Sequence, residues 1–180
     1  MQKKLSDSNK ERILIFIQNN PGCYLRQIRS ELELSMGSVQ YHSHHLEKVG
    51  KITSIRKGLY KLHFQSGVFQ DHEKNIIQVL NQETSREILL FIIEQKNPTQ
   101  TDIVYRLGIS APSVSWQVKR LIDFKIVDEV REGKYKRYKL NANLVDSEYI
   151  VKVLKTHHPN LWNKWSNRLA EMFLSLSIQE

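Results

Sequence analysis

The sequence contains two copies of one pattern, related by a shift of 75 positions. Under that shift the apolar run Ile13–Ile17 aligns with Ile88–Ile92. The match continues without a gap to Tyr60 and Lys61, which align with Tyr135 and Lys136. Two copies are too few for a solenoid, so we expect one structural unit that is used twice.

Length and charge fit two small domains of a basic protein. Of the 180 residues, 40% are hydrophobic, which is enough to form cores. The formal net charge of +8 follows the repeats: residues 1–64 carry +6, residues 65–144 carry +2 and residues 145–180 carry 0. A basic surface suits a polyanionic partner.

Cysteine usage and apolar runs indicate the compartment. Cys23 is the single cysteine, so no intrachain disulfide can form. The longest apolar runs are too short to cross a membrane, and the first residues lack the apolar stretch of a signal peptide. We therefore expect a cytoplasmic protein with no membrane partner.

Helix and turn signals predict three helices and a hairpin in each copy. In the first copy, Ser8 and Glu11 have capping-box spacing, and Asn20-Pro21-Gly22 ends the first helix. The further elements expected there are a helix over Leu25–Leu32, a helix over Gly37–Val49, and strands over Lys51–Ile55 and Tyr60–Phe64. Those expected in the second copy are a helix from Thr84 to about Glu94, helices over Thr101–Leu107 and Pro112–Phe124, and strands over Val127–Arg131 and Tyr135–Leu140.

Particular residues mark the ends of the predicted helices. Ser35 and Ser110 can cap the third helix of each copy through their side-chain oxygens. Gly108 follows the second helix of copy two, where a left-handed residue commonly ends a helix. Pro112 stands in the first turn of its helix, where a missing N–H costs nothing.

The order helix, helix–turn–helix, β-hairpin is that of a winged helix. The run Ser35–His42, followed by Leu46–Ile52, resembles the ArsR- and MarR-like winged helix-turn-helix family, and most of all its tandem versions among archaeal transcriptional regulators. The resemblance covers roughly residues 10–64 and 85–141. We expect a mainly α fold with small β-hairpins (α+β), divided into winged helices at 1–66 and 84–143, a linker helix at 67–83 and a C-terminal helical segment at 144–180.

One position departs from the family pattern. A large aliphatic side chain usually stands where this sequence has Ser43, and Val118 fills that position in copy two. Val39, Ser43, Leu46 and Val49 are expected to face inward together. The first copy should therefore have an underfilled core at Ser43.

The opposite face of each third helix and the two hairpins carry the side chains that DNA recognition uses. Gln can pair with adenine, Arg and Lys with guanine, and Ser, Tyr and cationic wing residues reach phosphates. In a helix-turn-helix the third helix enters the major groove. The candidates in copy one are Ser38, Gln40, Tyr41, His44, His45, Lys48, Arg56, Lys57 and Lys61, and those in copy two are Ser113, Ser115, Trp116, Lys119, Arg120, Arg131, Lys134, Lys136 and Arg137.

Plainer interpretations of these residues stay open. A charged hairpin is often a solvated edge that prevents aggregation. Tyr41 and Trp116 occupy matching positions and could pack on the wing or on a partner instead of DNA. Acidic residues such as Asp123 and Glu132 dilute copy two, so copy one is expected to bind DNA more strongly.

Metal binding and catalysis find little support. His42 and His45 are three positions apart, but no set of ligands with metal-site spacing accompanies them. The sequence has no Gly-rich phosphate loop or nucleophile elbow, and Cys23 has no obvious activating base. We expect no metal, no cofactor and no enzymatic activity.

The C-terminal segment carries an apolar stripe. Val145–Lys155 and Leu161–Leu176 read as helices separated by Pro159. The stripe could fold back on the chain's own core, but each copy already has all the elements of its unit without it, so we expect a dimerisation surface. Its residues are Trp162, Trp165, Leu169, Phe173 and Leu176.

These features together predict a sequence-specific double-stranded DNA-binding protein that regulates transcription as a homodimer. A protein-interaction adaptor built from winged helices is the alternative. RNA or single-strand binding would need exposed stacking platforms, for which only Tyr41 and Trp116 are candidates.

Overall fold

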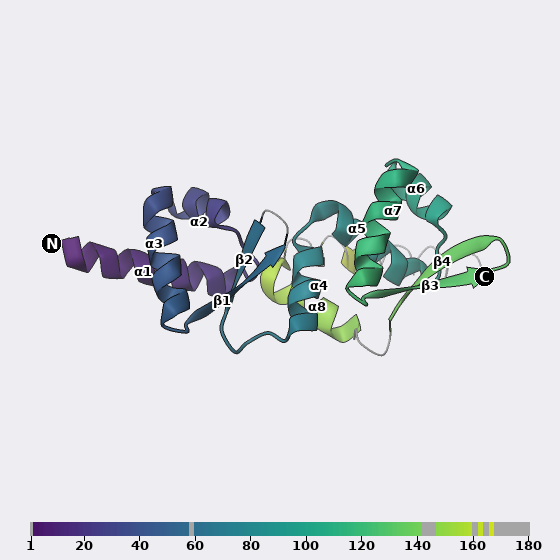
Figure 1. Cartoon of the computed structure of the whole chain (residues 1–180). Coiled ribbons are helices and arrows are strands. Elements are labelled where there is room, and N and C mark those ends of the chain that lie inside the picture. The colour runs from purple at the N-terminus through teal and green to yellow at the C-terminus, as the bar shows by residue number, and fades with distance from the viewer. Residues whose placement is uncertain (1, 58–59, 142–146, 160–161, 164–165, 168–180) are drawn as a thin grey trace. The chain divides into compact units, whose positions relative to one another are not determined.

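A computed structural model describes residues 2–57, 60–141, 147–159, 162–163 and 166–167 (Figure 1). The chain divides into two compact units, Met1–Lys74 and Asn75–Glu180, called unit 1 and unit 2 below. The four-part division predicted from the sequence is finer than these two units and stays a prediction.

Unit 1 has the order of a winged helix. Helix α1 spans Gln2–Asn19, α2 spans Leu25–Leu32 and α3 spans Met36–Lys48. Strands β1 (Ile52–Lys57) and β2 (Tyr60–Gln65) then form an antiparallel hairpin, the wing of unit 1. Helix α4 (Asp71–Leu80) follows the wing, and the boundary between the two units falls within it, after Lys74.

Unit 2 repeats the same order (Figure 1). Helices α5 (Glu83–Gln95), α6 (Gln100–Leu107) and α7 (Ala111–Asp123) correspond to α1, α2 and α3. Strands β3 (Val127–Glu132) and β4 (Tyr135–Leu140) form the second wing, and α8 (Ser147–His157) follows. The predicted fold, two winged helices with further helical segments, is therefore confirmed.

The first-helix starts predicted from the sequence are wrong. Helix α1 begins at Gln2, so Ser8 lies inside it and caps nothing. Helix α5 begins at Glu83 with Gln82 as its N-cap residue, and Thr84 stands in its first turn. The other caps were predicted correctly: the Ser35 and Ser110 hydroxyls accept from the amides of Ser38 and Ser113, and Gly108 is left-handed at φ 65°.

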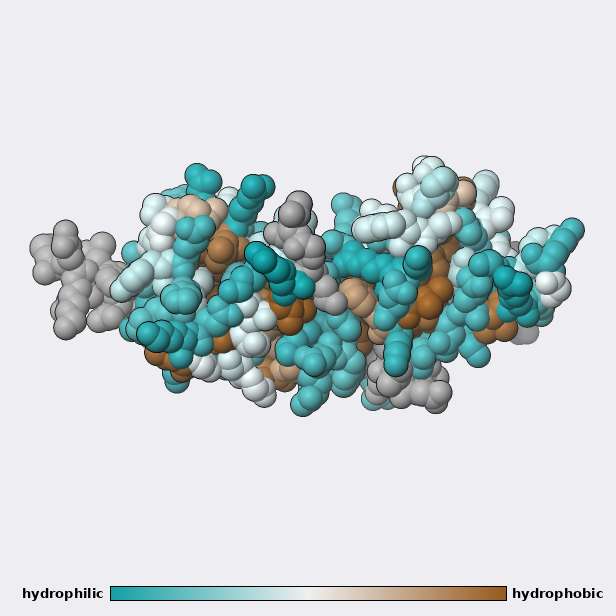
Figure 2. All heavy atoms as spheres, viewed as in Figure 1, coloured by the Kyte–Doolittle hydropathy of each residue, from teal (hydrophilic) through white to brown (hydrophobic). Residues whose placement is uncertain are grey.

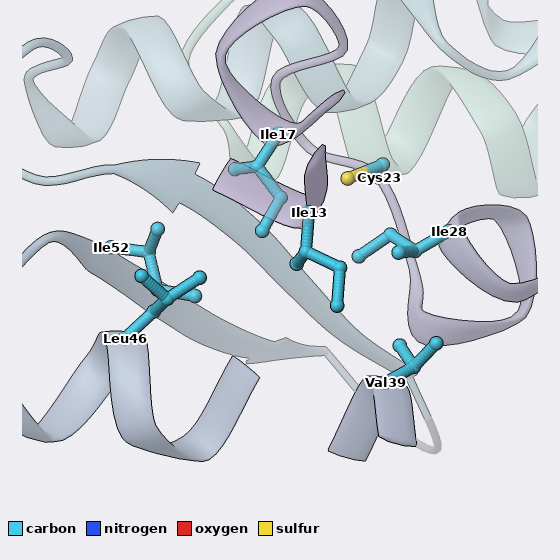
Figure 3. Packing of buried hydrophobic residues seen from close by; sticks show 7 residues of the cluster. All are labelled: Ile13, Ile17, Cys23, Ile28, Val39, Leu46 and Ile52. Atoms are coloured by element: carbon cyan, nitrogen blue, oxygen red, sulfur yellow. The ribbon is translucent and has the colours of Figure 1, made fainter. Parts of the chain in front are cut away.

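The core of unit 1 collects apolar side chains from α1, α2, α3 and β1, and from the turn between α1 and α2 (Figure 3). Each is at most 3% exposed: Ile13, Ile17, Cys23, Ile28, Val39, Leu46 and Ile52. The residues 75 positions later are also buried: Ile88, Ile92, Pro98, Ile103, Val114, Leu121 and Val127. The sequence repeat is thus a repeat of one core.

A backbone contact joins the segment after the first helix to the wing in both units. The amide of His63 donates to the carbonyl of Cys23 at 3.0 Å, and the amide of Tyr138 donates to the carbonyl of Pro98 at 2.9 Å. These pairs match under the 75-residue shift. The contact adds a short third segment beside the second wing strand, which anchors each wing to its unit.

The predicted inner face of the third helix is right at three positions and wrong at one. Val39, Ser43 and Leu46 are buried in α3, but Val49 follows the end of the helix and is 52% exposed. His42 takes a place on the buried face instead. Ser43 is 4% exposed, and its hydroxyl has no hydrogen-bond partner within the described residues.

The linker and the tail contribute buried surface of their own. Helix α4 buries Ile76, Ile77, Val79 and Leu80. In unit 2, α8 buries Ile150, Val153 and Leu154, and the His158 imidazole lies 2.9 Å from the Asn81 side-chain oxygen. Trp162 is half-buried, with the Lys155 ammonium 4.6 Å from its ring centroid.

Candidate nucleic-acid interface

The outer face of α3 is built by its cap and its buried stripe. Ser35 fixes the start of the helix, because its hydroxyl accepts from the Ser38 amide at 3.2 Å. Burial of Val39, Ser43 and Leu46 then directs the remaining side chains outward. The exposed set is Gln40, Tyr41, His44, His45 and Lys48, while Ser38 is half-buried.

Most of this outer face is unengaged. Within the described residues, no hydrogen bond or ion pair occupies the side chains of Gln40, His44, His45 or Lys48. Tyr41 is 67% exposed and meets the His42 ring edge-on at 5.2 Å between centroids. Hydrophilic residues cover much of the visible face of each unit (Figure 2). The α3 face can therefore offer donors and acceptors to a partner without first breaking internal bonds.

A carboxylate ties α3 to the wing of unit 1. Glu47 on α3 accepts hydrogen bonds from the Ser54 hydroxyl on β1 and from the Lys61 ammonium on β2, the latter at 2.7 Å. Burial opposes ionisation of Glu47, but these bonds and the nearby Lys61 charge lower its pKa below the usual value. Arg56 is exposed on β1. The Lys57 side chain lies outside the described part of the chain.

The outer face of α7 in unit 2 is more engaged. Ser113 and Ser115 are exposed, but the Ser113 hydroxyl pairs with Ser110 at 2.8 Å, and Ser115 accepts from Gln100 at 2.8 Å. Arg120 is half-buried and donates to the Gln82 side chain. The other members of the predicted set are exposed: Trp116 at 62%, and Lys119.

Two wing cations of unit 2 are held within the unit. Lys136 pairs with Glu129 at 2.9 Å, and Arg137 pairs with Glu132 and donates to the Asn97 carbonyl at 3.0 Å. Arg131 and Lys134 are exposed at the outer part of the hairpin. The wing of unit 2 thus presents a mixture of unpaired and neutralised cations.

A groove of unit 1, which sequence reasoning missed, brings α2, α3 and the wing together. Its volume is about 450 Å³. The Tyr24 and Tyr60 rings lie 5.6 Å apart between centroids at an angle of 44°. The alternation of Tyr60 with basic wing residues was a signal for it, but no pattern linked Tyr60 to Tyr24. Its lining residues are Tyr24, Leu25, Arg26, Met36, Gln40, Tyr60 and Lys61.

Other chemistry has little support in the described residues. Burial raises the pKa of the Cys23 thiol to about 12, so the thiolate nucleophile is not formed at neutral pH. Among the residues that the structure describes, no group of three or more His, Cys, Asp or Glu side chains could hold a metal ion. No described helix is both long and apolar enough to span a membrane.

The proposed dimer stripe lies largely outside the described residues. Trp165, Leu169, Phe173 and Leu176 are not among them, and Trp162 is the one member that can be placed. The dimerisation residues therefore stay a prediction.

Comparison with known families agrees with the two units. A family model described as an N-terminal HTH domain matches residues 7–77. A second model, described as winged helix-turn-helix DNA-binding, matches residues 81–127. The fold is therefore two winged helix-turn-helix units in tandem, and a family model matches part of each. The tandem winged-helix arrangement predicted from the repeat is confirmed by these matches.

A relative supports the same assignment over most of the chain. An uncharacterized HTH-type transcriptional regulator of Methanocaldococcus jannaschii is 25% identical over 145 residues, which cover 80% of this tandem winged-helix chain. The aligned part covers 36% of that relative's length.

Solved structures resemble about half of the chain. HlyU from Vibrio cholerae is 16% identical, with a TM-score of 0.40, over 48% of this chain and 88% of its own. A homodimeric winged helix-turn-helix DNA-binding domain from Mycobacterium bovis, a possible ArsR-family regulator, is 20% identical, with a TM-score of 0.41, over 49% and 82%. These scores are low, so the assignment rests on the chain's own elements and on the family matches.

Proposed function

We propose that this tandem winged-helix protein binds double-stranded DNA sequence-specifically and thereby regulates transcription. The observation that carries the proposal is the outer face of α3, where Gln40, His44, His45 and Lys48 are exposed and unengaged within the described residues. A helix with this face fits the major groove, where amide and cationic side chains distinguish base pairs. The match of residues 81–127 to a DNA-binding family supports it.

Salt dependence tests the proposal directly. Lys and Arg side chains that neutralise phosphates release condensed counterions, so log Kd should change steeply with log salt concentration. Titration of a duplex pool at several salt concentrations measures the slope, and selection of bound sequences from the same pool measures specificity. A flat slope, or no duplex binding at low salt, would contradict DNA binding.

The proposed role requires no catalysis. A regulator of this kind acts through occupancy of DNA, so we infer that the chain is not an enzyme and uses no cofactor. It would act in the cytoplasm, the compartment expected from the sequence.

We also propose that the chain forms a homodimer through Trp162, Trp165, Leu169, Phe173 and Leu176. The support is the apolar stripe itself, on a segment with no net charge. Pairing two chains would raise affinity through effective concentration when two half-sites are present.

A truncation tests the dimer. Because α8 buries Ile150 and Leu154, the truncated chain should end after Pro159 and so keep α8. We expect light scattering to show a dimer for the full chain and a folded monomer with weaker DNA binding for the truncation. A monomeric full chain would assign the stripe to packing within the chain.

A further inference from the structure

The groove of unit 1 has a distinct chemical character. Leu25 and Met36 give it apolar lining, and the Tyr24 and Tyr60 rings form an aromatic pair at its side. Lys61 at its edge is already paired with Glu47. The Arg26 guanidinium makes no hydrogen bond or ion pair within the described residues. The groove therefore combines an apolar and aromatic surface with one available positive charge.

The corresponding positions of unit 2 carry different side chains. Under the 75-residue shift, Thr99, Gln100 and Thr101 replace Tyr24, Leu25 and Arg26. The Gln100 amide donates to the Ala111 carbonyl at 3.1 Å and to the Ser115 hydroxyl at 2.8 Å. This bridge joins α6 to α7 where unit 1 has its groove, so unit 2 provides an internal control.

We infer that the groove of unit 1 seats the sugar–phosphate backbone of duplex DNA, with a phosphate at Arg26 and a deoxyribose against the Tyr24–Tyr60 pair. This inference rests on the proposed function, because it assigns further residues to the same interface. None of Tyr24, Arg26 and Tyr60 belongs to the contact set predicted from the sequence.

The position of the groove is the first reason for this assignment. Gln40, which we expect to face base edges, lines it from α3, and Tyr60 and Lys61 line it from the wing. A duplex that contacts both α3 and the wing must pass one strand across the residues between them. Those residues are the lining of the groove.

Its chemistry is the second reason. Phosphate oxygens are bound by Arg and Tyr side chains in protein–DNA interfaces, and such contacts fix the register of the protein on the duplex. The carbon-rich face of deoxyribose suits the aromatic rings and the Leu25 and Met36 side chains. The contact carries no sequence information, so it should raise affinity for all duplexes and hold Gln40 in register.

Paired arginine variants of the full chain test the phosphate contact. Arg26 and Arg29 are both exposed on α2, but Arg29 does not line the groove. We expect Arg26→Ala to weaken binding of a fixed duplex about tenfold, and to lower the salt slope by about one, because it removes one charged contact. Arg29→Ala should change both much less. Equal effects of the two variants would overturn the inference.

A neutral-phosphate scan locates the contact on the DNA. Single methylphosphonate substitutions are placed along the duplex that the wild-type protein selects. We expect one position where the wild type loses affinity and Arg26→Ala loses little more, because the contact is already absent. If Arg26→Ala stays as sensitive as the wild type at every phosphate, Arg26 does not contact the backbone. If the wild type binds no duplex, the proposed function fails instead.

The aromatic pair needs its own comparison. Tyr60→Ala in the groove is matched by Tyr135→Ala, which removes the corresponding tyrosine of unit 2. Both rings are more than half exposed, so both variants should fold. We expect Tyr60→Ala to weaken binding several-fold for all sequences and Tyr135→Ala to have a smaller effect. A larger loss from Tyr135→Ala would contradict a groove specific to unit 1.

Discussion

In unit 1 the wing lysine pairs with a carboxylate on the third helix, whereas in unit 2 the corresponding lysine pairs with a carboxylate on the wing itself. Glu47 binds Ser54 and Lys61, but its counterpart in unit 2 is Ile122. The position of Ser54 is taken there by Glu129, which pairs with Lys136. The two units share one fold, but the ion pair joins the third helix to the wing in unit 1, whereas in unit 2 it neutralises a wing lysine within the wing.

The third helices also differ, in the charge and the hydrogen bonding of their outer faces. Lys48 of unit 1 corresponds to Asp123 of unit 2, so the charge at the end of the helix is reversed. Gln40 is unengaged within the described residues, whereas its counterpart Ser115 accepts a hydrogen bond from Gln100. Polar groups that are free to bind can read bases, and groups already bonded must first exchange partners. We therefore expect unit 1 to carry most of the base selection.

The largest effect is expected from core truncations, which test whether the two units unfold independently. Ile28 and Ile103 are matching core residues, and both are fully buried. Truncation to Ala at such a site typically costs about 2–5 kcal/mol, so Ile28→Ala should destabilise unit 1 and Ile103→Ala unit 2. Hydrogen exchange, followed separately for α1–α3 and α5–α7, measures where protection is lost.

The two variants serve as controls for each other. If the units unfold separately, each variant leaves the exchange of the other unit unchanged. Loss of protection in both units from either variant would mean that they unfold as one cooperative block, and the comparison of two self-sufficient units would fail.

The next effect concerns base selection. Gln40→Ala should relax base preference at the contacted position by about 1–3 kcal/mol, because a bidentate amide contact to a base is lost. The matched change Ser115→Ala should alter the selected consensus little. Sequencing of duplexes selected by the wild type and by both variants gives the answer. An unchanged consensus for Gln40→Ala together with a changed one for Ser115→Ala would reverse the assignment.

A smaller effect is expected at a core position of the third helix where the units differ in polarity. Ser43 is buried with an unsatisfied hydroxyl within the described residues, and unit 2 has Val118 there at 2% exposure. Ser43→Val should stabilise unit 1 by about 1 kcal/mol, since it removes a buried polar group and adds apolar contact. The reciprocal change, Val118→Ser, should destabilise unit 2.

Denaturant unfolding of both variants measures this pair. A loss of stability in Ser43→Val would mean that the site has no room for two methyl groups. The small residue would then be required by the packing of α3, and unit 1 would not be underfilled.

The repeat made the fold predictable because the core positions of the two units correspond. Positions such as Ile28 and Ile103 keep an apolar side chain in both copies, and buried positions dominate the pattern of periodicity. Helix starts were less predictable. The capping-box spacing of Ser8 with Glu11 is a local signal, and the helix runs through it from Gln2. A local capping signal does not start a helix where the residues before it are themselves helical.

The candidate site was predictable only in part, for a different physical reason. Helical periodicity placed Gln40 and Lys48 on the outer face of α3, but it does not say which polar side chains are already engaged. The bond from Arg120 to Gln82 joins residues 38 positions apart. The Tyr24–Tyr60 pair likewise depends on β2 pairing with the segment that precedes α2. Such contacts between distant segments leave no periodic signal.

The smallest expected effect uses a buried histidine that distinguishes the two wings. His63 on β2 is 2% exposed, and Tyr138 takes its place in unit 2. Burial, together with the nearby Lys61 charge, lowers the pKa of His63 below its usual value near 6.5, although its contacts with Cys23 and Glu47 oppose the shift. Between the folded and the unfolded pKa, the unfolded chain binds more protons. The stability of unit 1 should therefore fall as the pH drops below about 6.5.

A matched pair of glutamine variants isolates this contribution. His63→Gln removes the buried titrating group, and His72→Gln removes an exposed histidine of the same unit. Between pH 7 and 5, unit 1 should lose less stability in His63→Gln than in the wild type, and His72→Gln should behave as the wild type does. Burial also lowers the pKa of His158 in unit 2, so the readout must be the exchange of unit 1 amides. An unchanged pH slope in His63→Gln would mean that His63 takes up a proton without disturbing the wing, and that the two wings respond to acid alike.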